Sequence, residues 1–154
     1  HDEFTAPSIM TMLSRTADYA VRAVVLLARH YGERLVSADE IASMLGAPRN
    51  YMSKTLNALV RHGVLSSMRG PGGGFTLAIP PDTLTVAMVI DVFADTRPVV
   101  ARCLLEDRPC NLDAPCSAHR RWMTITRIAR EPLVATTIGE LCGTQQCSNA
   151  SNKG

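Results

Sequence analysis

Three cysteines lie close together in the second half of this 154-residue chain, Cys103, Cys110 and Cys116, with six and five residues between them. Prolines and charged residues interrupt the pattern around them, so the segment is expected to be irregular. Irregular backbone lets thiolates converge on one point, as a soft-metal site requires. Three thiolates leave one coordination position open on either a two-iron or a four-iron cluster. The spacing therefore predicts an iron–sulfur site with a fourth, non-cysteine ligand.

Two side chains are candidates for that fourth position. His119 follows Cys116 by three residues. Asp18 is the only acid on the expected first helix, and we expect it to reach across from the second subunit of a dimer. Asp18 is the preferred ligand, because His119 lies where a helix begins and its ring can point along that helix. Taken singly, Asp18 also fits a first-turn acid that the helix dipole favours, and His119 an ordinary surface histidine.

Other interpretations of the cysteines remain open. They can be small core residues, although a polar, proline-broken segment is a poor core. Three cysteines and a histidine can bind zinc, although zinc ligands usually come in pairs two to four residues apart. A thiol switch without metal is a third alternative. Cys142 and Cys147 are interpreted as bystanders near a frayed end.

The elements that precede the cysteines follow the helix-turn-helix pattern. Ser37 and Glu40 form a capping box before a short helix that ends near Leu45, and a glycine turn leads to a longer helix over residues 48–63. Residues 64–68 and 75–78 read as two strands joined by a glycine-rich loop. A hairpin after the second helix is typical of the wing of a winged helix. The predicted fold class is mainly α with a small β-hairpin wing.

Residues 48–79 contain four basic side chains and no acidic one. Such a block is typical of a surface that contacts phosphates, although a solvated face is the simpler alternative. We expect the second helix to enter the major groove of double-stranded DNA and the wing to approach the backbone or minor groove. The predicted DNA contacts are Arg49, Asn50, Tyr51, Ser53, Lys54, Arg69, Gly72, Gly73 and Gly74.

Enzymatic and electron-transfer functions find little support. The glycine-rich loop joins two strands and lacks the Lys-Ser/Thr of a phosphate-binding loop, and no nucleophile–base pairing stands out. An iron–sulfur electron carrier would not need a basic recognition helix and a wing. We therefore expect a binding protein that is not an enzyme.

Further helices are expected over residues 14–31, from Thr85 through Phe93, and from Cys116 onward, with a bend or end at Pro132 and a second capping box at residues 137–140. The long helix carries a narrow apolar seam that needs a partner, most simply its copy in a homodimer. The predicted dimer interface is Trp122, Ile125, Ala129 and Leu133.

Composition agrees with a compact helical protein. Hydrophobic residues make up 46% of the chain, aromatic residues 5% and charged residues 19%, and the net charge is +2. No apolar run approaches the ~20 residues of a membrane span, and the first residues lack the features of a signal peptide. We therefore expect a cytoplasmic protein with reduced thiols.

The predicted organisation is an expression remnant or disordered segment (1–11), a winged-helix DNA-binding domain (12–94), a cysteine cluster-binding loop (95–117), a dimerisation helix and C-terminal helix (118–142) and a disordered tail (143–154).

Residues 16–23 (TADYAVRA), the wing sequence at 69–75 (RGPGGGF) and the three cysteines resemble the Rrf-two (Rrf2) family of bacterial winged-helix iron–sulfur regulators, over residues 12 to about 142. The resemblance implies a dimer whose helix-turn-helix and wing both touch DNA. It divides over the fourth ligand: Asp18 matches the NsrR-like members, which use a four-iron cluster, and His119 the IscR-like members, which use two irons. A four-iron cluster is slightly favoured. The resemblance implies a transcriptional repressor that senses nitric oxide, redox state or the supply of iron–sulfur clusters. The alternative is a regulator on the same scaffold that uses thiol chemistry or zinc instead of an iron–sulfur cluster.

Overall fold

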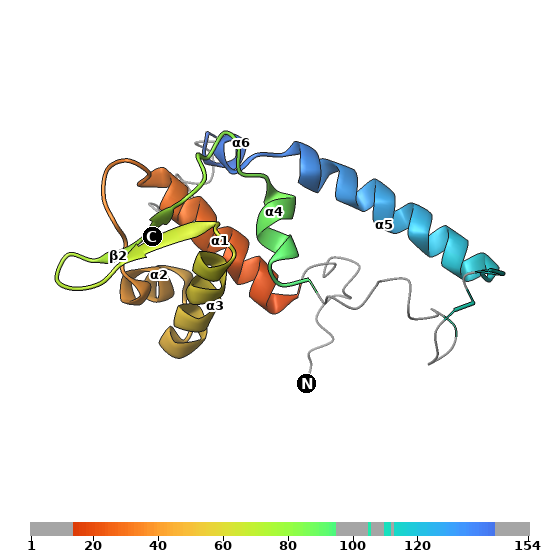
Figure 1. Ribbon diagram of the computed structural model, residues 1–154, viewed down its shortest axis with the longest axis horizontal. Coiled ribbons are helices and arrows are strands. Elements are labelled where there is room, and N and C mark those ends of the chain that lie inside the picture. The colour runs from red at the N-terminus through yellow and green to blue at the C-terminus, as the bar shows by residue number, and fades with distance from the viewer. Residues whose placement is uncertain (1–13, 95–104, 106–109, 112, 144–154) are drawn as a thin grey trace, which may run out of the picture.

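The computed structural model describes residues 14–94, 105, 110–111 and 113–143, without the side chains of Trp122 and Thr126. The predicted N-terminal remnant, Cys103 and most of the tail lie outside these residues. Figure 1 shows the arrangement of the elements. In chain order they are α1 (Arg15–Arg29), α2 (Ala38–Leu45), α3 (Arg49–Arg61), β1 (Leu65–Met68), β2 (Gly74–Leu77), α4 (Val86–Asp91), α5 (Ser117–Ala135) and α6 (Ile138–Cys142).

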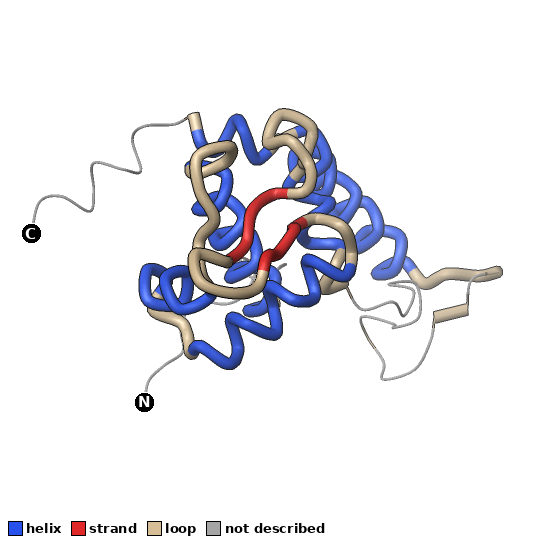
Figure 2. Tube along the Cα trace, turned by 60° about the vertical axis from the view of Figure 1, so that its left-hand side comes forward, coloured by secondary structure: helices blue, strands red, loops and turns tan. Residues whose placement is uncertain are grey.

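The hairpin after α3 forms the expected wing. Strands β1 and β2 pair antiparallel, with Leu65 opposite Leu77 and Met68 opposite Gly74. Val36, just before α2, adds an isolated bridge to β2 through two backbone hydrogen bonds with Phe75 of 2.8 and 3.1 Å. The wing is therefore anchored on its β2 side to the segment that precedes α2. Figure 2 shows the two strands in red among the helices. The predicted winged-helix fold is confirmed.

Helix α1 is the centre of the core. Its buried face includes Ala20, Val24 and Leu27, and it contacts α2, α3, α4, α6 and β2. These buried residues recur at intervals of three and four, which is the spacing that places side chains on one side of a helix. Ser14 begins the helix by accepting a hydrogen bond from the backbone amide of Ala17 at 3.1 Å.

After α5 the chain returns to this core. The backbone amide of Ile138 donates to the carbonyl of Leu84 at 2.7 Å, and the amide of Val86 donates to Thr136 at 3.0 Å. Ile138 is fully buried, and α6 packs on α1. The short helix α6 is therefore part of the winged-helix core rather than an extension of α5.

Helix α5 projects away from that core in Figure 1. Arg130 ties it to α4 through a two-pronged ion pair with Asp91, at 2.7 and 2.9 Å. Pro132, which was expected to bend or end the helix, does not end it, because the helix continues to Ala135. Among the described residues, no helix combines the length and apolar character of a membrane span.

One of the two predicted capping boxes is only half formed. At the start of α2, Ser37 accepts from the amide of Glu40 at 3.2 Å, but the Glu40 carboxylate binds Arg34 instead of the Ser37 backbone, at 2.6 and 3.0 Å. The guanidinium offers a charge-assisted partner, and it holds the pKa of Glu40 below its ordinary value. At the start of α6, Thr137 and Glu140 form the complete box that was expected.

Candidate DNA-binding face and cysteine site

The exposed side of α3 is polar and free of acids. Met52, Leu56 and Leu59 point into the core and are fully buried, so the other side of the helix faces outward. Asn50 and Lys54 are exposed there, and Ser53 is half-buried. Asn57, also exposed, follows Asn50 by two helical turns on the same side and was missed by the sequence prediction, although the seven-residue spacing would have indicated it. This face has the length and chemistry of a groove-reading helix.

Arg49 lies at the first turn of α3, but it is not free. Its Nε forms an ion pair with Asp39 of α2, and both side chains are about two-thirds exposed. Asp39 lies just outside the acid-free block of residues 48–79 that the sequence analysis identified. The predicted phosphate contact of Arg49 therefore competes with a neighbouring carboxylate.

Tyr51 is placed differently from the other predicted DNA contacts. Its side chain is half-buried, and its hydroxyl lies 2.5 Å from the Thr16 hydroxyl on α1. Its ring packs edge-to-face on Tyr19, with the ring centroids 5.7 Å apart. Both ends of the side chain therefore contact α1.

The wing glycines have structural reasons of their own. Gly72 has a φ of +73°, which side-chain-bearing residues rarely adopt. A Cβ on Gly73 would collide with the carbonyl oxygens of Met68 and Gly70, and one on Gly74 would lie 2.6 Å from the Val36 carbonyl. The glycines thus close the hairpin and seat it on Val36, besides leaving the exposed loop with little bulk.

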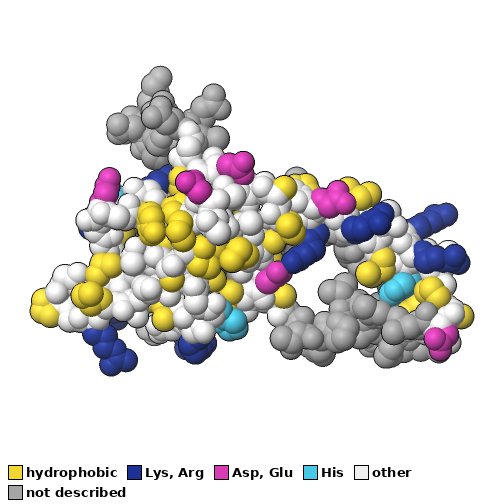
Figure 3. All heavy atoms as spheres, turned by 45° about the horizontal axis from the view of Figure 1, so that its top comes forward, with side chains coloured by type: hydrophobic (Ala, Val, Ile, Leu, Met, Phe, Trp, Pro, Cys, Tyr) yellow, Lys and Arg dark blue, Asp and Glu magenta, His cyan; other side chains and the backbone are white. Residues whose placement is uncertain are grey.

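Basic side chains gather at two ends of the molecule. Figure 3 shows them near the wing and again toward the far end of α5. Arg69 and Lys54 are exposed on the wing and α3. Helix α5 carries four exposed arginines and a single acid. The first group forms the candidate DNA-binding face, which lies at the opposite end of the molecule from the start of α5, where Cys116 lies (Figure 1).

Two of the three predicted cysteine ligands come together. The sulfur atoms of Cys110 and Cys116 lie 3.8 Å apart, and both side chains are half-buried. Cys116 is also the N-cap of α5: its sulfur accepts the backbone amide of His119 at 3.3 Å. Cys116 therefore lies at the N-terminus of the long helix with its sulfur next to that of Cys110.

The two candidates for the fourth ligand lie apart in the single chain. His119 is buried, with 8% of its surface exposed, one turn into α5 and thus near the cysteine pair. Asp18 is on α1, where it forms an ion pair with Arg22 at 3.0 Å. Within the described residues, no three metal-binding side chains converge, and Cys103 is not among these residues.

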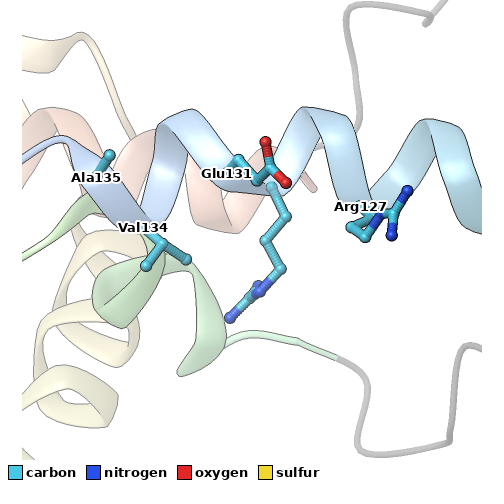
Figure 4. Close-up of a pocket in the computed structure, with 5 residues that line it drawn as sticks. Arg127, Glu131, Val134 and Ala135 are labelled. Carbon is cyan, nitrogen blue, oxygen red and sulfur yellow. The ribbon is translucent and has the colours of Figure 1, made fainter.

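The long helix presents apolar side chains that its own chain leaves uncovered. Ile125 is 52% exposed and Ile128, outside the predicted seam, 58%. Ala129 is half-buried, while Leu133 packs partly against the core of its own subunit. A shallow recess, mostly apolar, lies on the same helix and is lined by Arg127, Arg130, Glu131, Val134 and Ala135 (Figure 4).

Comparison with known proteins assigns the chain to a family of transcriptional regulators. The family model "Rrf2: Iron-dependent Transcriptional regulator" matches residues 13–144. A putative HTH-type transcriptional regulator of Aquifex aeolicus is 34% identical, over 88% of this chain and 94% of its own length. The regulator IscR of Aliivibrio salmonicida is 28% identical, over 92% and 83%.

Solved structures have the same fold. The IscR of T. potens superposes with a TM-score of 0.73 at 23% identity, over 92% of this chain and 93% of that one. CymR, the global cysteine regulator of B. subtilis, superposes with a TM-score of 0.71 at 25% identity, over 86% and 97%. CymR is described as a cysteine regulator, whereas the name of IscR states no signal, so the shared fold does not identify the signal to which this chain responds.

Proposed function

Because the chain belongs to the Rrf2 family of transcriptional regulators, we propose that it represses genes by binding operator DNA as a homodimer, and that a metal centre at the cysteine segment sets its affinity. Helix α3 enters the major groove with Asn50, Ser53 and Lys54 foremost. The wing, with Arg69 at the start of its loop, follows the adjacent backbone. The exposed apolar side chains of α5 are the surface on which two chains meet.

The observation that carries the metal proposal is the separation of two sulfur atoms. Two thiolates bound at about 2.3 Å to one tetrahedral metal lie about 3.8 Å apart. The sulfurs of Cys110 and Cys116 are separated by 3.8 Å. In a four-iron cube each iron takes one thiolate, so cysteines on separate irons lie farther apart. The geometry therefore favours two cysteines on one metal, as in a two-iron cluster or a zinc site, over the four-iron cluster expected from the sequence.

The remaining ligands come from three residues in this proposal. Cys103 supplies a third thiolate. His119, whose backbone amide contacts the Cys116 sulfur, is the candidate for an imidazole ligand from the same chain. Asp18 of the partner subunit is the alternative, since α1 lies far from the start of α5 in its own chain (Figure 1). A bound iron–sulfur cluster would supply iron–sulfur bonds that react with nitric oxide or oxidants, and the cluster can be lost as a result.

This chain's own residues would convert that change into a change in DNA affinity. A metal held by Cys110 and Cys116 would join the segment before α5 to the N-cap of that helix. Arg130 and Asp91 join the same helix to α4 and the winged-helix core. The tilt of α5 thus sets the spacing of two recognition helices, which must match half-sites roughly 34–36 Å apart. A switch from mostly bound to mostly free needs about 5 kcal/mol of differential binding.

The test is purification without oxygen, followed by an absorption spectrum and iron, sulfide and zinc analysis. An iron–sulfur regulator is coloured, whereas a zinc protein is colourless with one zinc per chain. Cys110→Ser and Cys116→Ser should each abolish the metal, while the matched control Cys142→Ser should retain it. Full metal content in either single variant would remove that cysteine from the site. The metal-loaded and metal-free forms are then compared on one DNA duplex, and equal affinities would exclude metal control.

Two variants distinguish the two candidates for the fourth ligand. His119→Ala should shift the spectrum and lower the reduction potential if imidazole is bound, because imidazole ligands raise the potential of a two-iron centre. Asp18→Ala should then leave both unchanged. The reverse outcome would assign the position to Asp18 of the partner subunit.

A thiol switch is the second candidate, supported by the same pair of sulfurs. Cys110 and Cys116 need to approach by less than 2 Å to reach a disulfide bond of about 2.05 Å. Two thiols then lose two electrons and two protons to an added oxidant such as diamide. Under this alternative, metal-free protein loses two mass units on oxidation and changes its DNA affinity, and Cys110→Ser prevents both changes.

A further inference from the structure

Tyr51 lies among the polar residues of the recognition helix, yet its contacts run to α1. Its hydroxyl and that of Thr16 are 2.5 Å apart, although 35 residues separate them in the chain. The Tyr19 ring meets the Tyr51 ring at an interplanar angle of 71°, in the edge-to-face geometry that aromatic pairs prefer. One hydroxyl contact and one ring contact thus join the first turn of α3 to the first turns of α1.

Further contacts along α1 link Tyr19 to Asp18, the candidate fourth metal ligand. The Arg22 guanidinium lies 6.0 Å from the centre of the Tyr19 ring, within the range of a cation–π interaction. The same guanidinium pairs with Asp18 at 3.0 Å. Asp18, Arg22, Tyr19 and Tyr51 are therefore linked pairwise, from the candidate ligand to the recognition helix.

We propose that Tyr51 is a positioning residue, which fixes the angle of α3 against α1, and that it does not read bases. The proposal rests on the DNA-binding role of α3 given above and corrects the predicted contact at this residue. The two groups of Tyr51 that could contact DNA already contact α1, because the hydroxyl is engaged with Thr16 and the ring packs on Tyr19. Asn50 and Lys54 are exposed on either side of it and have no such engagement with α1 among the described contacts.

Tyr51→Phe and Thr16→Val test the hydroxyl contact from its two sides. Each removes one oxygen with little change of shape, and Thr16 is on α1 rather than on the recognition helix. Each single variant should lower the equilibrium constant for folding about 2- to 10-fold in urea titrations. The double variant should lose no more than the larger single loss, because both remove the same bond. Additive losses would contradict the contact. Tyr31→Phe, an exposed tyrosine beyond the end of α1, is the control and should change nothing.

Amide hydrogen exchange adds a readout that needs no DNA. If the contact holds α3 in place, Thr16→Val should speed exchange in the first turns of α3 as much as Tyr51→Phe does. Unchanged exchange in α3 of Thr16→Val would overturn the positioning role.

Base reading is tested on a duplex that the wild-type protein selects from a randomised DNA pool. Both variants should weaken binding by a similar factor to the selected duplex and to each of its single-base-pair substitutions. Asn50→Ala, by contrast, should lose discrimination at one position. If Tyr51→Phe loses discrimination at one position while Thr16→Val binds like wild type, Tyr51 reads bases and the proposal is wrong. If the wild type selects no sequence, the proposed function fails, and the folding and exchange measurements still decide the role of Tyr51.

Discussion

Asp39 on α2 and Arg49 at the start of α3 form an ion pair across the turn of the helix-turn-helix. Both side chains remain about two-thirds exposed, so the pair contributes little to folding stability. Its position matters more, because it places a negative charge beside the proposed DNA-binding face. If Arg49 contacts a phosphate in the proposed complex, its guanidinium exchanges the Asp39 carboxylate for that phosphate on binding.

Asp39→Asn should therefore tighten DNA binding about two- to fivefold at low salt, since it frees Arg49 and removes a repulsive charge. The measurement is a titration of labelled duplex at several salt concentrations. Asp82→Asn is the matched control: it removes an exposed acid between β2 and α4, outside the helix-turn-helix, and should leave affinity unchanged. Weaker binding by Asp39→Asn would indicate that the pair instead orients Arg49 for contact.

Gly74→Ala should destabilise the fold by about 2 kcal/mol or more, because its Cβ would press on the Val36 carbonyl. Gly72→Ala should cost only about 1 kcal/mol, since φ strain is its sole penalty and the space around it is open. Urea titrations measure both. Equal losses would mean that the wing shifts away from Val36 at little cost.

Ile125→Glu should convert dimers to monomers in sedimentation experiments at micromolar concentration. The charge would be buried between two α5 helices without a partner. Met44→Glu is the control, because Met44 is a comparably exposed apolar side chain (61% against 52%) on α2. A dimer that survives Ile125→Glu, or a wild-type monomer, would refute the α5 interface.

Cys142 should react slowly with iodoacetamide in the folded protein. Burial raises the pKa of its thiol, with Arg29 partly opposing the effect, and its sulfur contacts the Val25 carbonyl. A raised pKa means less thiolate at a given pH, so the rate should lie below that of urea-unfolded protein at pH 8. The rate in the folded protein should also continue to rise with pH at values where the thiol of the unfolded protein is already fully ionised. Peptide mass spectrometry isolates this cysteine, and equal folded and unfolded rates would contradict its burial.

The order of the elements was predictable from sequence because it depends on local chemistry. Ser14 begins α1, the glycine turn separates α2 from α3, and the glycine-rich loop joins β1 to β2. Each of these signals acts over a few residues, through backbone hydrogen bonds or allowed φ angles. The capping box of α2 failed in part because its glutamate found Arg34, a competitor outside the four-residue motif.

The sequence by itself determined the winged-helix fold, the acid-free recognition helix and the cysteine segment, since periodicity and composition carry that information. Only the tertiary structure decided which groups meet: Asp39 with Arg49, Thr16 with Tyr51, and Cys110 with Cys116 at 3.8 Å. It also returned α6 to the core, where Ile138 is buried below α1. Such pairings join residues on different elements, and their geometry follows from how the helices pack, which no local pattern encodes.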